Sequence, residues 1–430
     1  MTELNKAVRT LVFGVMSLAP LHPVLCAAEI HEAVKKGDAA KVQTLIGGNP
    51  ALANDRDGYS LTPLHYAAML GLKEIAELLL AKGAGIDLRT ADGKSAYNLA
   101  LEAGQPGWAQ WLAGRGAGHG PQEFPVLKGP YFGQKPPGPK PEIFAPGVFS
   151  TVYRDSPPEF SADGREVYWS RKPFRQGSSG GQNWLGGMAV MYARLEDEGW
   201  TAPRALPFTG GEANGYNTRL SADGRRLFFC SNTRPPAAEP RENFSGTNVP
   251  TGDLWVSQRA GQGWSDPVPL APPVNSVGDD DCATLAQDGT LYFLRWRPDA
   301  GETNAVYGIY RARFTQGAFE SPEPLPSPIN TKYGEYPTYI APDQSYLIFV
   351  SMRPEGRGSL DLYVTFRLKD GSWSAPVSMG DEINSPGVDT HGRVTPDGKY
   401  FFFTSNRGGL WFVYWTEATI IDELRRRALS

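Results

Sequence analysis

The most regular feature of the apolar and polar positions is a phrase that the chain repeats five times. Each copy has an apolar residue, two small or polar residues, Asp-Gly or a variant of it, and then a run rich in aromatic and β-branched residues. The copies begin at Phe160, Leu220, Leu285, Ile340 and Val394. The run predicts a strand and the Asp-Gly step predicts a tight turn, so each copy predicts a hairpin. A phrase that returns every 54 to 65 residues indicates one structural unit copied along the chain.

Each unit continues in a constant order beyond its hairpin. A third strand follows, as in residues 361–365, and then a segment that combines an aromatic residue with a proline. The aromatic residues of that segment are Trp200, Trp264, Phe319 and Trp373. Four strands per unit is the pattern of a β-propeller blade, and we expect the repeated aromatic side chains to pack between neighbouring blades. The sequence therefore predicts an all-β domain, a five-bladed β-propeller over residues 141–418.

The last unit lacks its outer strand. After residues 409–415 the chain runs into a helical pattern at residues 419–430, which predicts a C-terminal helix. Upstream of the first unit, residues 141–150 are similar to the outer ends of the other units. We expect this upstream strand to complete the final blade and close the ring, because closure removes exposed strand edges. A sixth blade hidden in residues 122–149 is the alternative.

A second and shorter period occupies residues 29–118. Gly37, Gly71 and Gly104 recur at intervals of 34 and 33 residues, and the central copy reads Thr-Pro-Leu-His-Tyr-Ala from Thr62. This segment resembles the ankyrin repeat, which implies a stack of paired helices with His65 in a structural role. The chain is therefore predicted to be multidomain, with a short helical stack, a Pro/Gly linker at residues 119–140 and then the propeller.

The ankyrin resemblance implies contact with a protein partner through the concave face and the hairpin tips. The candidate partner-binding residues are those of the predicted tips, Asp57, Tyr59 and Asp92. A stabilising cap that binds no partner is the alternative for this domain.

The hairpins resemble the WD-like propeller family typified by the periplasmic TolB protein. The most specific matches are the Asp-Gly-Arg or Asp-Gly-Lys hairpins that follow Ser161, Ser221 and Thr395, whereas the fourth copy departs with Gln344 in place of glycine. The resemblance implies a periplasmic or secreted binding module of the kind found in cell-envelope complexes.

Residues 1–28 have the pattern of a secretory signal peptide. Lys6 and Arg9 precede an apolar stretch that ends in small residues before Glu29. A membrane anchor and a lipid attached at Cys26 are the alternatives, but the stretch is short and broken by prolines. We expect a periplasmic or secreted protein with no membrane span after cleavage of the signal.

Charge and cysteine content narrow the partners. The net charge of −4 gives no basic footprint for nucleic acid. Cys230 and Cys282 would remain after signal cleavage, and neither has the spacing of a metal ligand. A disulfide bond between them is left open, as is the identity of any small-molecule ligand.

One position that repeats between the units carries candidate chemistry. Four acidic side chains stand eight residues before the hairpin aspartate, namely Asp155, Asp280, Glu335 and Asp389, and the remaining unit has Gly215. In a propeller this position opens the innermost strand, so the acids could converge at the channel mouth and hold a divalent cation or a cationic peptide. The alternative is that each acid caps a turn within its own blade. His391, two residues after Asp389, is expected on the same face of its strand.

No catalytic residue and no bound cofactor are predicted, because His391 has no placed nucleophile beside it. The sequence favours a non-catalytic recognition or scaffolding protein that binds a protein partner in the cell envelope. Two alternatives remain: a hydrolase or lyase that acts on glycans or peptides at the channel mouth, and a carbohydrate-binding propeller that uses Trp184 and Trp296.

Overall fold

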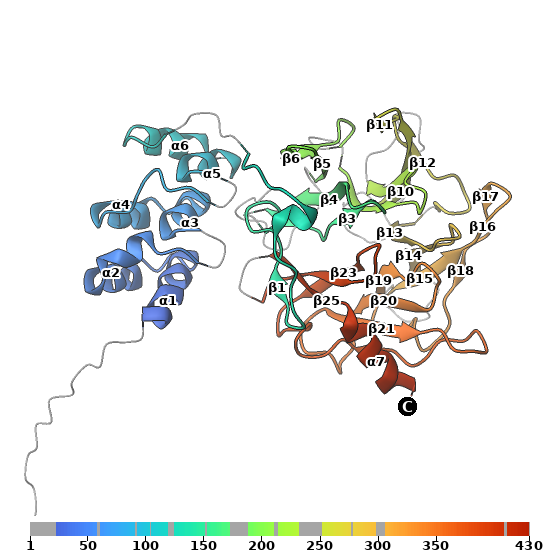
Figure 1. The fold of residues 1–430 in the computed structure, drawn as a ribbon. Helices are drawn as coiled ribbons and strands as arrows, with labels where there is room; N and C mark the ends of the chain where they lie inside the picture. The colour runs from blue at the N-terminus through green and yellow to red at the C-terminus, as the bar shows by residue number, and fades with distance from the viewer. Residues whose placement is uncertain are drawn as a thin grey trace, which may run out of the picture.

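A stack of paired helices and a ring of five antiparallel sheets follow one another along the chain in the computed structural model (Figure 1). The structure describes residues 23–57, 61–90, 93–103, 105–118, 124–150, 153–172, 188–209, 214–231, 252–276, 278–297, 306–407 and 411–429. Most of the expected signal segment, together with Tyr59, Asp92 and Trp184, lies outside these residues. No helix in the described ranges is long and apolar enough to cross a membrane.

The N-terminal stack consists of three helix pairs within the described residues. These are α1 (Pro23–Lys35) with α2 (Ala39–Gly48), α3 (Pro63–Leu70) with α4 (Lys73–Ala81), and α5 (Ala96–Glu102) with α6 (Pro106–Ala113); a short 3-10 helix, η1 (Pro50–Asn54), follows α2. Ala67 and Ala68 are fully buried and let α3 approach its neighbours closely, while Leu79 brings the apolar face of α4 into the same core. The stack therefore has a hydrophobic core of its own.

His65 ties one repeat to the next. Thr62 caps α3, and the Nδ1 atom of His65 accepts the Thr62 backbone N–H at 2.9 Å. The opposite ring nitrogen, Nε2, therefore carries the hydrogen and donates to the Leu88 carbonyl at 2.9 Å. Ser95 and Asn98 form the same capping arrangement at α5. The structural role expected for His65 is confirmed.

The remainder of the chain forms five blades that surround a central channel. Blade 1 contains β2 (Arg154–Asp155), β3 (Glu159–Phe160), β4 (Glu166–Lys172), β5 (Ala189–Glu196), β6 (Gly199–Trp200) and β7 (Arg204–Ala205). Blade 2 contains β8 (Tyr216–Leu220), β9 (Arg226–Ser231), β10 (Asp253–Ala260), β11 (Gly263–Trp264) and β12 (Val268–Pro269). Blade 3 contains β13 (Asp280–Leu285), β14 (Leu291–Arg297), β15 (Val306–Ala312) and β18 (Glu323–Pro324), with the ribbon of β16 (Phe314–Thr315) and β17 (Ala318–Phe319).

Blade 4 contains β19 (Glu335–Ile340), β20 (Tyr346–Ser351), β21 (Asp361–Phe366) and β22 (Val377–Ser378). Blade 5 contains β23 (Asp389–Val394), β24 (Tyr400–Ser405) and β25 (Phe412–Glu417), with β1 (Glu142–Ile143) as its outer strand. The C-terminal helix α7 (Thr419–Leu429) contacts β21 and buries Ile421 and Leu424 against blades 4 and 5.

The ring is closed as the sequence predicts. Glu142 and Ile143 of β1 pair with Trp415 and Tyr414 of β25. The Phe144 N–H extends the ladder by donating to the Val413 carbonyl at 2.8 Å. Residues 124–150 thus supply a closing strand and the short 3-10 helix η2 (Pro130–Gly133), and the ring has five blades, so the alternative of a sixth blade is wrong.

The five Asp-Gly turns share one hydrogen-bond pattern. In each turn the aspartate accepts the backbone N–H two residues later, as Asp223 does from Arg225 at 3.0 Å; the other acceptors are Asp163, Asp288, Asp343 and Asp397. Gln344 adopts the left-handed conformation of the glycines, with φ at 60°. Its side-chain amide accepts from Tyr292 at 2.8 Å and donates to Asp288 at 2.9 Å. These bonds help to hold a conformation that only glycine adopts at no steric cost.

The repeated aromatic residues pack at the seams between blades. Trp264 of blade 2 donates to the Tyr168 hydroxyl of blade 1, and Trp373 lies in a core shared by blades 3 and 4. Trp200 lies in a core shared by blades 1 and 5. Phe319 packs against the core shared by blades 2 and 3. The packing expected of these four positions is confirmed.

Candidate functional site in the propeller channel

Irregular inner strands shape the channel. The innermost strands of blades 2 to 5 each carry a register shift near their start, as between Tyr216 and Arg219 in β8. Such bulges redirect side chains and are common beside functional sites. At the shift in blades 2, 3 and 5 stands a non-glycine residue with left-handed backbone, namely Asn217, Cys282 and His391, with φ of 52°, 51° and 56°. Backbone of this kind costs energy and is concentrated at binding and catalytic sites.

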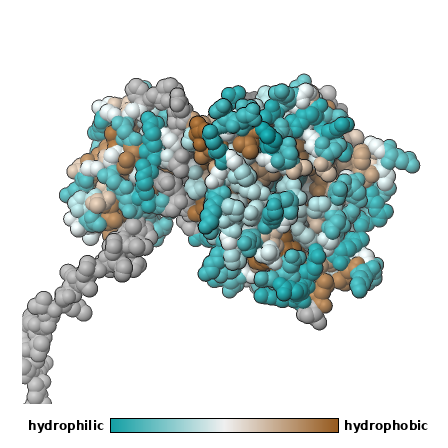
Figure 2. Space-filling model, viewed as in Figure 1, coloured by the Kyte–Doolittle hydropathy of each residue, from teal (hydrophilic) through white to brown (hydrophobic). Residues whose placement is uncertain are grey.

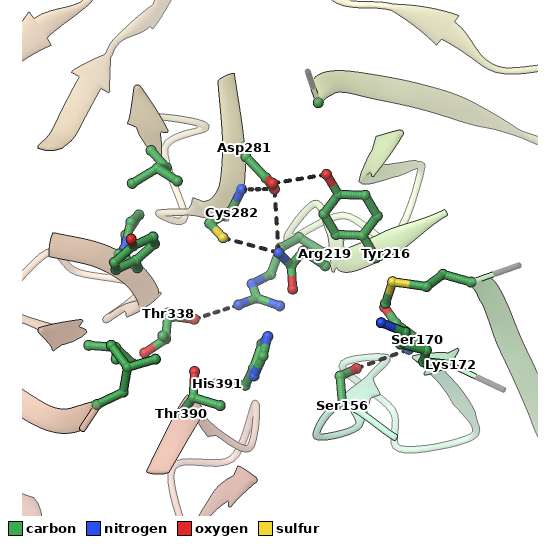
Figure 3. A pocket seen from close by; sticks show the side chains of 18 of the residues that line it. Ser156, Ser170, Lys172, Tyr216, Arg219, Asp281, Cys282, Thr338, Thr390 and His391 are labelled. Carbon is green, nitrogen blue, oxygen red and sulfur yellow. Dashed lines mark hydrogen bonds between the residues drawn. The ribbon is translucent and has the colours of Figure 1, made fainter. Parts of the chain in front are cut away.

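These strands surround a chamber of about 450 Å³, which has the size of a small-molecule site. All five blades contribute to it, and Figure 3 shows the Arg219 guanidinium near its middle with His391 beside it. Its polar lining includes Arg154, Ser156, Lys172, Tyr216, Asn217, Arg219, Asp279, Asp281, Cys282, Tyr307, Tyr336, Thr338, Thr390 and His391. A second cavity of about 750 Å³ lies among the Asp-Gly hairpins, and Arg219 lines both cavities.

One wall of the chamber carries acids that orient tyrosines. Asp281 accepts from the Tyr216 hydroxyl at 2.9 Å, and Asp279 accepts from the Tyr307 hydroxyl at 2.8 Å. Burial raises the pKa of Asp279. Both carboxylates are thus engaged by tyrosine hydroxyls, and this wall presents the tyrosine rings to the chamber.

Two buried arginines lie at the centre of the ring. Arg219 is 6 % exposed and donates to the Thr218 carbonyl at 2.7 Å and to the Thr338 carbonyl. Arg393 is 2 % exposed, and its charge acts on Arg219. Glu159 is the carboxylate that both guanidinium groups approach, at 3.9 Å from Arg219 and 3.3 Å from Arg393. Burial lowers the pKa of both arginines, which signals that the pair is poorly compensated.

His391 lies between these groups. Burial lowers its pKa well below the ordinary 6.5, and the charges of Arg154, Arg393 and Arg219 lower it further, so the ring is neutral at pH 7. Its Nδ1 atom is buried and has no hydrogen-bond partner among the described residues. A general base is normally oriented by a third group, and no such group holds this nitrogen in the described part of the chain.

The four predicted carboxylates each face an arginine of the same blade. Their side chains are fully buried. The pairs are Asp155–Arg171 at 2.7 Å, Asp280–Arg295 at 2.6 Å, Glu335–Arg353 at 3.4 Å and Asp389–Arg407 at 3.1 Å. We refer to these four pairs as the blade latches.

Each latch also binds backbone. In blade 5, Asp389 accepts the Ser385 N–H at 2.6 Å, and Arg407 donates to the carbonyls of Glu382 and Ile383. These bonds match the turn-capping alternative. The expected convergence into a cation site is not found, because no cluster of three or more His, Cys, Asp or Glu side chains that could hold a metal occurs in the described residues. Of the sequence candidates, Asp155 and His391 line the chamber, and the Nδ1 atom of His391 has no hydrogen-bond partner among the described residues. Sequence reasoning missed Arg219, Arg393 and the tyrosines.

The two cysteines are free thiols in the structure. Cys230 is fully buried in the core between blades 2 and 3, and Cys282 accepts from the Asn217 amide at 3.1 Å in the chamber wall. Burial raises the pKa of both thiols well above the usual value. A disulfide bond between them is therefore absent, and both act as packing residues.

The helical stack touches the propeller near the chamber. Tyr153, which directly precedes β2, packs against the core of the stack, and the Lys94 ammonium lies 5.2 Å from the centre of its ring. Of the predicted partner-binding residues, Asp57 accepts from the Tyr66 hydroxyl at 2.6 Å and from the Leu61 N–H at 3.0 Å, so its carboxylate braces its own repeat. Arg56 and Arg89 nearby are exposed.

Comparison with known proteins identifies the class of domain to which the helical stack belongs. Residues 30–122 match a family model described as ankyrin repeats (3 copies). Ankyrin repeat domain-containing protein 13C-B of Xenopus laevis is 41% identical over 75 residues, which is 17% of this chain and 14% of that protein.

Two further relatives match stretches of similar length. The human Ankyrin repeat domain-containing protein 13C is 40% identical over 75 residues, covering 17% of this chain and 14% of that protein. Mouse Inversin is 33% identical over 78 residues, covering 18% of this chain and 7% of that protein. The chain thus spans a small part of the length of these relatives, and the likeness concerns the repeats.

Proposed function

We propose that this is an exported recognition protein of the cell envelope, periplasmic or secreted, whose ankyrin repeats bind a protein partner while the propeller serves as a rigid platform. The match of residues 30–122 to ankyrin repeats carries the proposal, because such repeats imply protein–protein interaction. The signal-like pattern of residues 1–28 and the TolB-like, WD-like hairpins support export.

The exposed surface of the stack is suited to such contact. Figure 2 shows hydrophilic residues over most of the propeller face in view, whereas the stack carries hydrophobic residues between hydrophilic ones. Leu101 on α5 is 44% exposed. Arg56 of one repeat donates to the Arg89 carbonyl of the next at 2.7 Å, so two exposed arginines stand on adjacent repeats. Arginine is favoured at protein interfaces.

The test is affinity capture from the envelope fraction with the mature full chain, followed by titration of the recovered partner. Arg56→Glu and Arg89→Glu reverse charge on the proposed surface and are each expected to weaken binding by about 1–2 kcal/mol, roughly 5- to 30-fold in Kd. Lys82→Glu is the matched control, because Lys82 is an exposed cation at the end of α4. Equal binding by all three variants, or capture that survives removal of residues 29–118, would contradict the proposal.

A further inference from the structure

Two buried arginines in the middle of the channel share one carboxylate. Glu159 is the one carboxylate within ion-pair distance of Arg219 or Arg393 among the described residues. Glu159 lines the cavity among the hairpins, on the far side of Arg219 from the chamber. Three carboxylates line the chamber itself, and each already holds a donor of its own: Asp155, Asp279 and Asp281. Because burying a cation without a counter-charge is expensive, an anion on the chamber side of Arg219 would be stabilised.

Unused hydrogen-bonding atoms belong to Arg219 and His391, which line the chamber, and to Arg393, whose charge acts on both. Arg219 Nε, Arg393 Nε and Nη2, and His391 Nδ1 are buried and have no hydrogen-bond partner in the part of the chain that the structure describes. Buried polar atoms of native proteins nearly always have a partner, and an exception calls for an explanation such as a ligand or water. Three of these four atoms are N–H donors of arginine, and donors of this type select an oxyanion.

The rim of the chamber adds positive charge. Arg154 and Lys172 come from neighbouring strands β2 and β4 and both line the chamber. Burial lowers the pKa of Arg154 to about 10, and burial together with the Arg154 charge lowers the pKa of Lys172. Each cation is thus destabilised by its surroundings, and an anion between them and Arg219 would relieve that effect.

We propose that the chamber binds a small organic carboxylate, held by Arg219, Lys172 and His391, with its carbon skeleton against the tyrosine wall. The volume of about 450 Å³ admits a metabolite-sized molecule and no folded protein segment. Tyr216 and Tyr336 supply aromatic surface to the lining of the chamber. The inference concerns the propeller and stands apart from partner binding by the ankyrin repeats.

The test is isothermal titration calorimetry of the full mature chain with succinate and citrate, and with succinamide as the uncharged counterpart of succinate. We expect one succinate or citrate per chain and at least tenfold weaker binding of succinamide, because the amide removes both negative charges. Equal affinity for succinate and succinamide would overturn the proposal. So would a failure of both succinate and citrate to bind at about 10 mM.

Two variants place the site. Lys172→Gln removes a half-buried rim cation, and His391→Asn keeps a residue that tolerates left-handed backbone. Each is expected to weaken carboxylate binding about tenfold. Arg225→Gln is the control, since Arg225 is exposed and lines the other cavity. Full binding in both Lys172→Gln and His391→Asn, each shown to be folded by circular dichroism, would contradict the assignment. A loss in Arg225→Gln as large as theirs would contradict it as well.

Discussion

The chemistry of single residues in the channel depends on which charges find partners. Arg171, Arg295, Arg353 and Arg407 meet a carboxylate in their own blade, whereas Arg219 and Arg393 share Glu159. His391 stands next to this shared group and stays neutral, since a proton on its ring would add a third charge. The neutral ring makes the stability of the propeller depend on pH.

The folded-state pKa of His391 lies well below its ordinary 6.5, because the ring is buried and faces Arg154, Arg393 and Arg219. Below about pH 6.5 the unfolded chain therefore binds a proton that the folded chain refuses. We expect the free energy of unfolding to be fully developed above pH 7 and to fall between pH 6.5 and about 5. Urea unfolding at several pH values measures it.

The His391→Asn variant is the control for this dependence, since the remaining described histidines, His31 and His65, lie in the ankyrin stack. Its unfolding free energy should fall less than that of the parent over the same pH range. Identical curves for parent and variant would contradict the role given to His391. The turn aspartates, such as Asp163, have a pKa lowered by Ser161 and backbone donors, so they act only at still lower pH.

Sequence reasoning found the carboxylate half of each latch and gave turn capping as one interpretation, but it missed the arginine partners. The spacing to the hairpin turn locates Asp155, Asp280, Glu335 and Asp389, because a repeat places equivalent residues at equivalent positions. The arginine partners stand 15 to 18 residues later, on the second strand or just after it. A carboxylate at this position can point into the channel or toward an arginine of its own blade. The choice depends on the side-chain direction near a bulge, and the spacing of residues does not reveal that direction.

At the scale of elements, the blade latches join each inner strand to the segment that leads into it. In blade 5, Asp389 opens β23, while Arg407 follows β24 and reaches the carbonyls of Glu382 and Ile383. The latch therefore fixes the point at which the chain passes from one blade to the next. A buried charge that loses its partner is strongly destabilising, although an intact pair adds little net stability.

Asp389→Asn is expected to lower the free energy of unfolding by about 2–4 kcal/mol, because Arg407, whose side chain is 24% exposed, would keep its charge in a partly buried site without the carboxylate. Chemical denaturation followed by tryptophan fluorescence measures this loss. Asp381→Asn is the matched control, since Asp381 pairs with Arg357 at 3.1 Å but is 86% exposed. A loss no larger than that of the control would show that Asp389 is not a bracing group.

The hairpins show which element features could be predicted. Asp-Gly turns depend on one local hydrogen bond and one left-handed residue, so the sequence alone locates all five. Gln344 breaks the pattern in sequence and keeps it in structure, because its side chain bonds to Asp288 and Tyr292 of the neighbouring blade. That compensation comes from a residue more than 50 positions away and cannot be read locally.

At the scale of the whole molecule, the ring is held shut by a short strand and an aromatic cluster. β1 is two residues long, and the fully buried Phe144 follows it directly. The Phe144 ring contacts Phe402 and Trp415 of blade 5 and Phe160 of blade 1. Side-chain packing across the seam therefore contributes more to closure than the two paired residues of the strand.

Phe144→Ala should lower the free energy of unfolding by about 3–5 kcal/mol and expose the edge of β25, which favours aggregation. Denaturation and light scattering of the full chain measure the two effects. Phe314→Ala is the control, because Phe314 lies half-buried in the small ribbon of β16 and β17. Little loss of stability in Phe144→Ala would mean that the seam does not depend on this cluster.

Closure and blade number could be predicted from the repeat pattern. The last unit lacks its outer strand, and the strand that precedes the first unit fits that empty position. The chamber could not be predicted, since its basic residues come from blades 1, 2 and 5 and no single repeat contains its pattern. The contact between Tyr153 and the ankyrin core also follows from three-dimensional placement alone.

The two segments that meet at the ring closure are synthesised far apart in time. Ser150 and Val413 exchange hydrogen bonds across 263 positions, so one side leaves the ribosome long before the other. In a nascent chain the closing strand stays unpaired until the last sheet has emerged, and such long-range closure is slow. We expect every interrupted chain to lack the final sheet and keep an open rim, which exposes it to aggregation and to proteases.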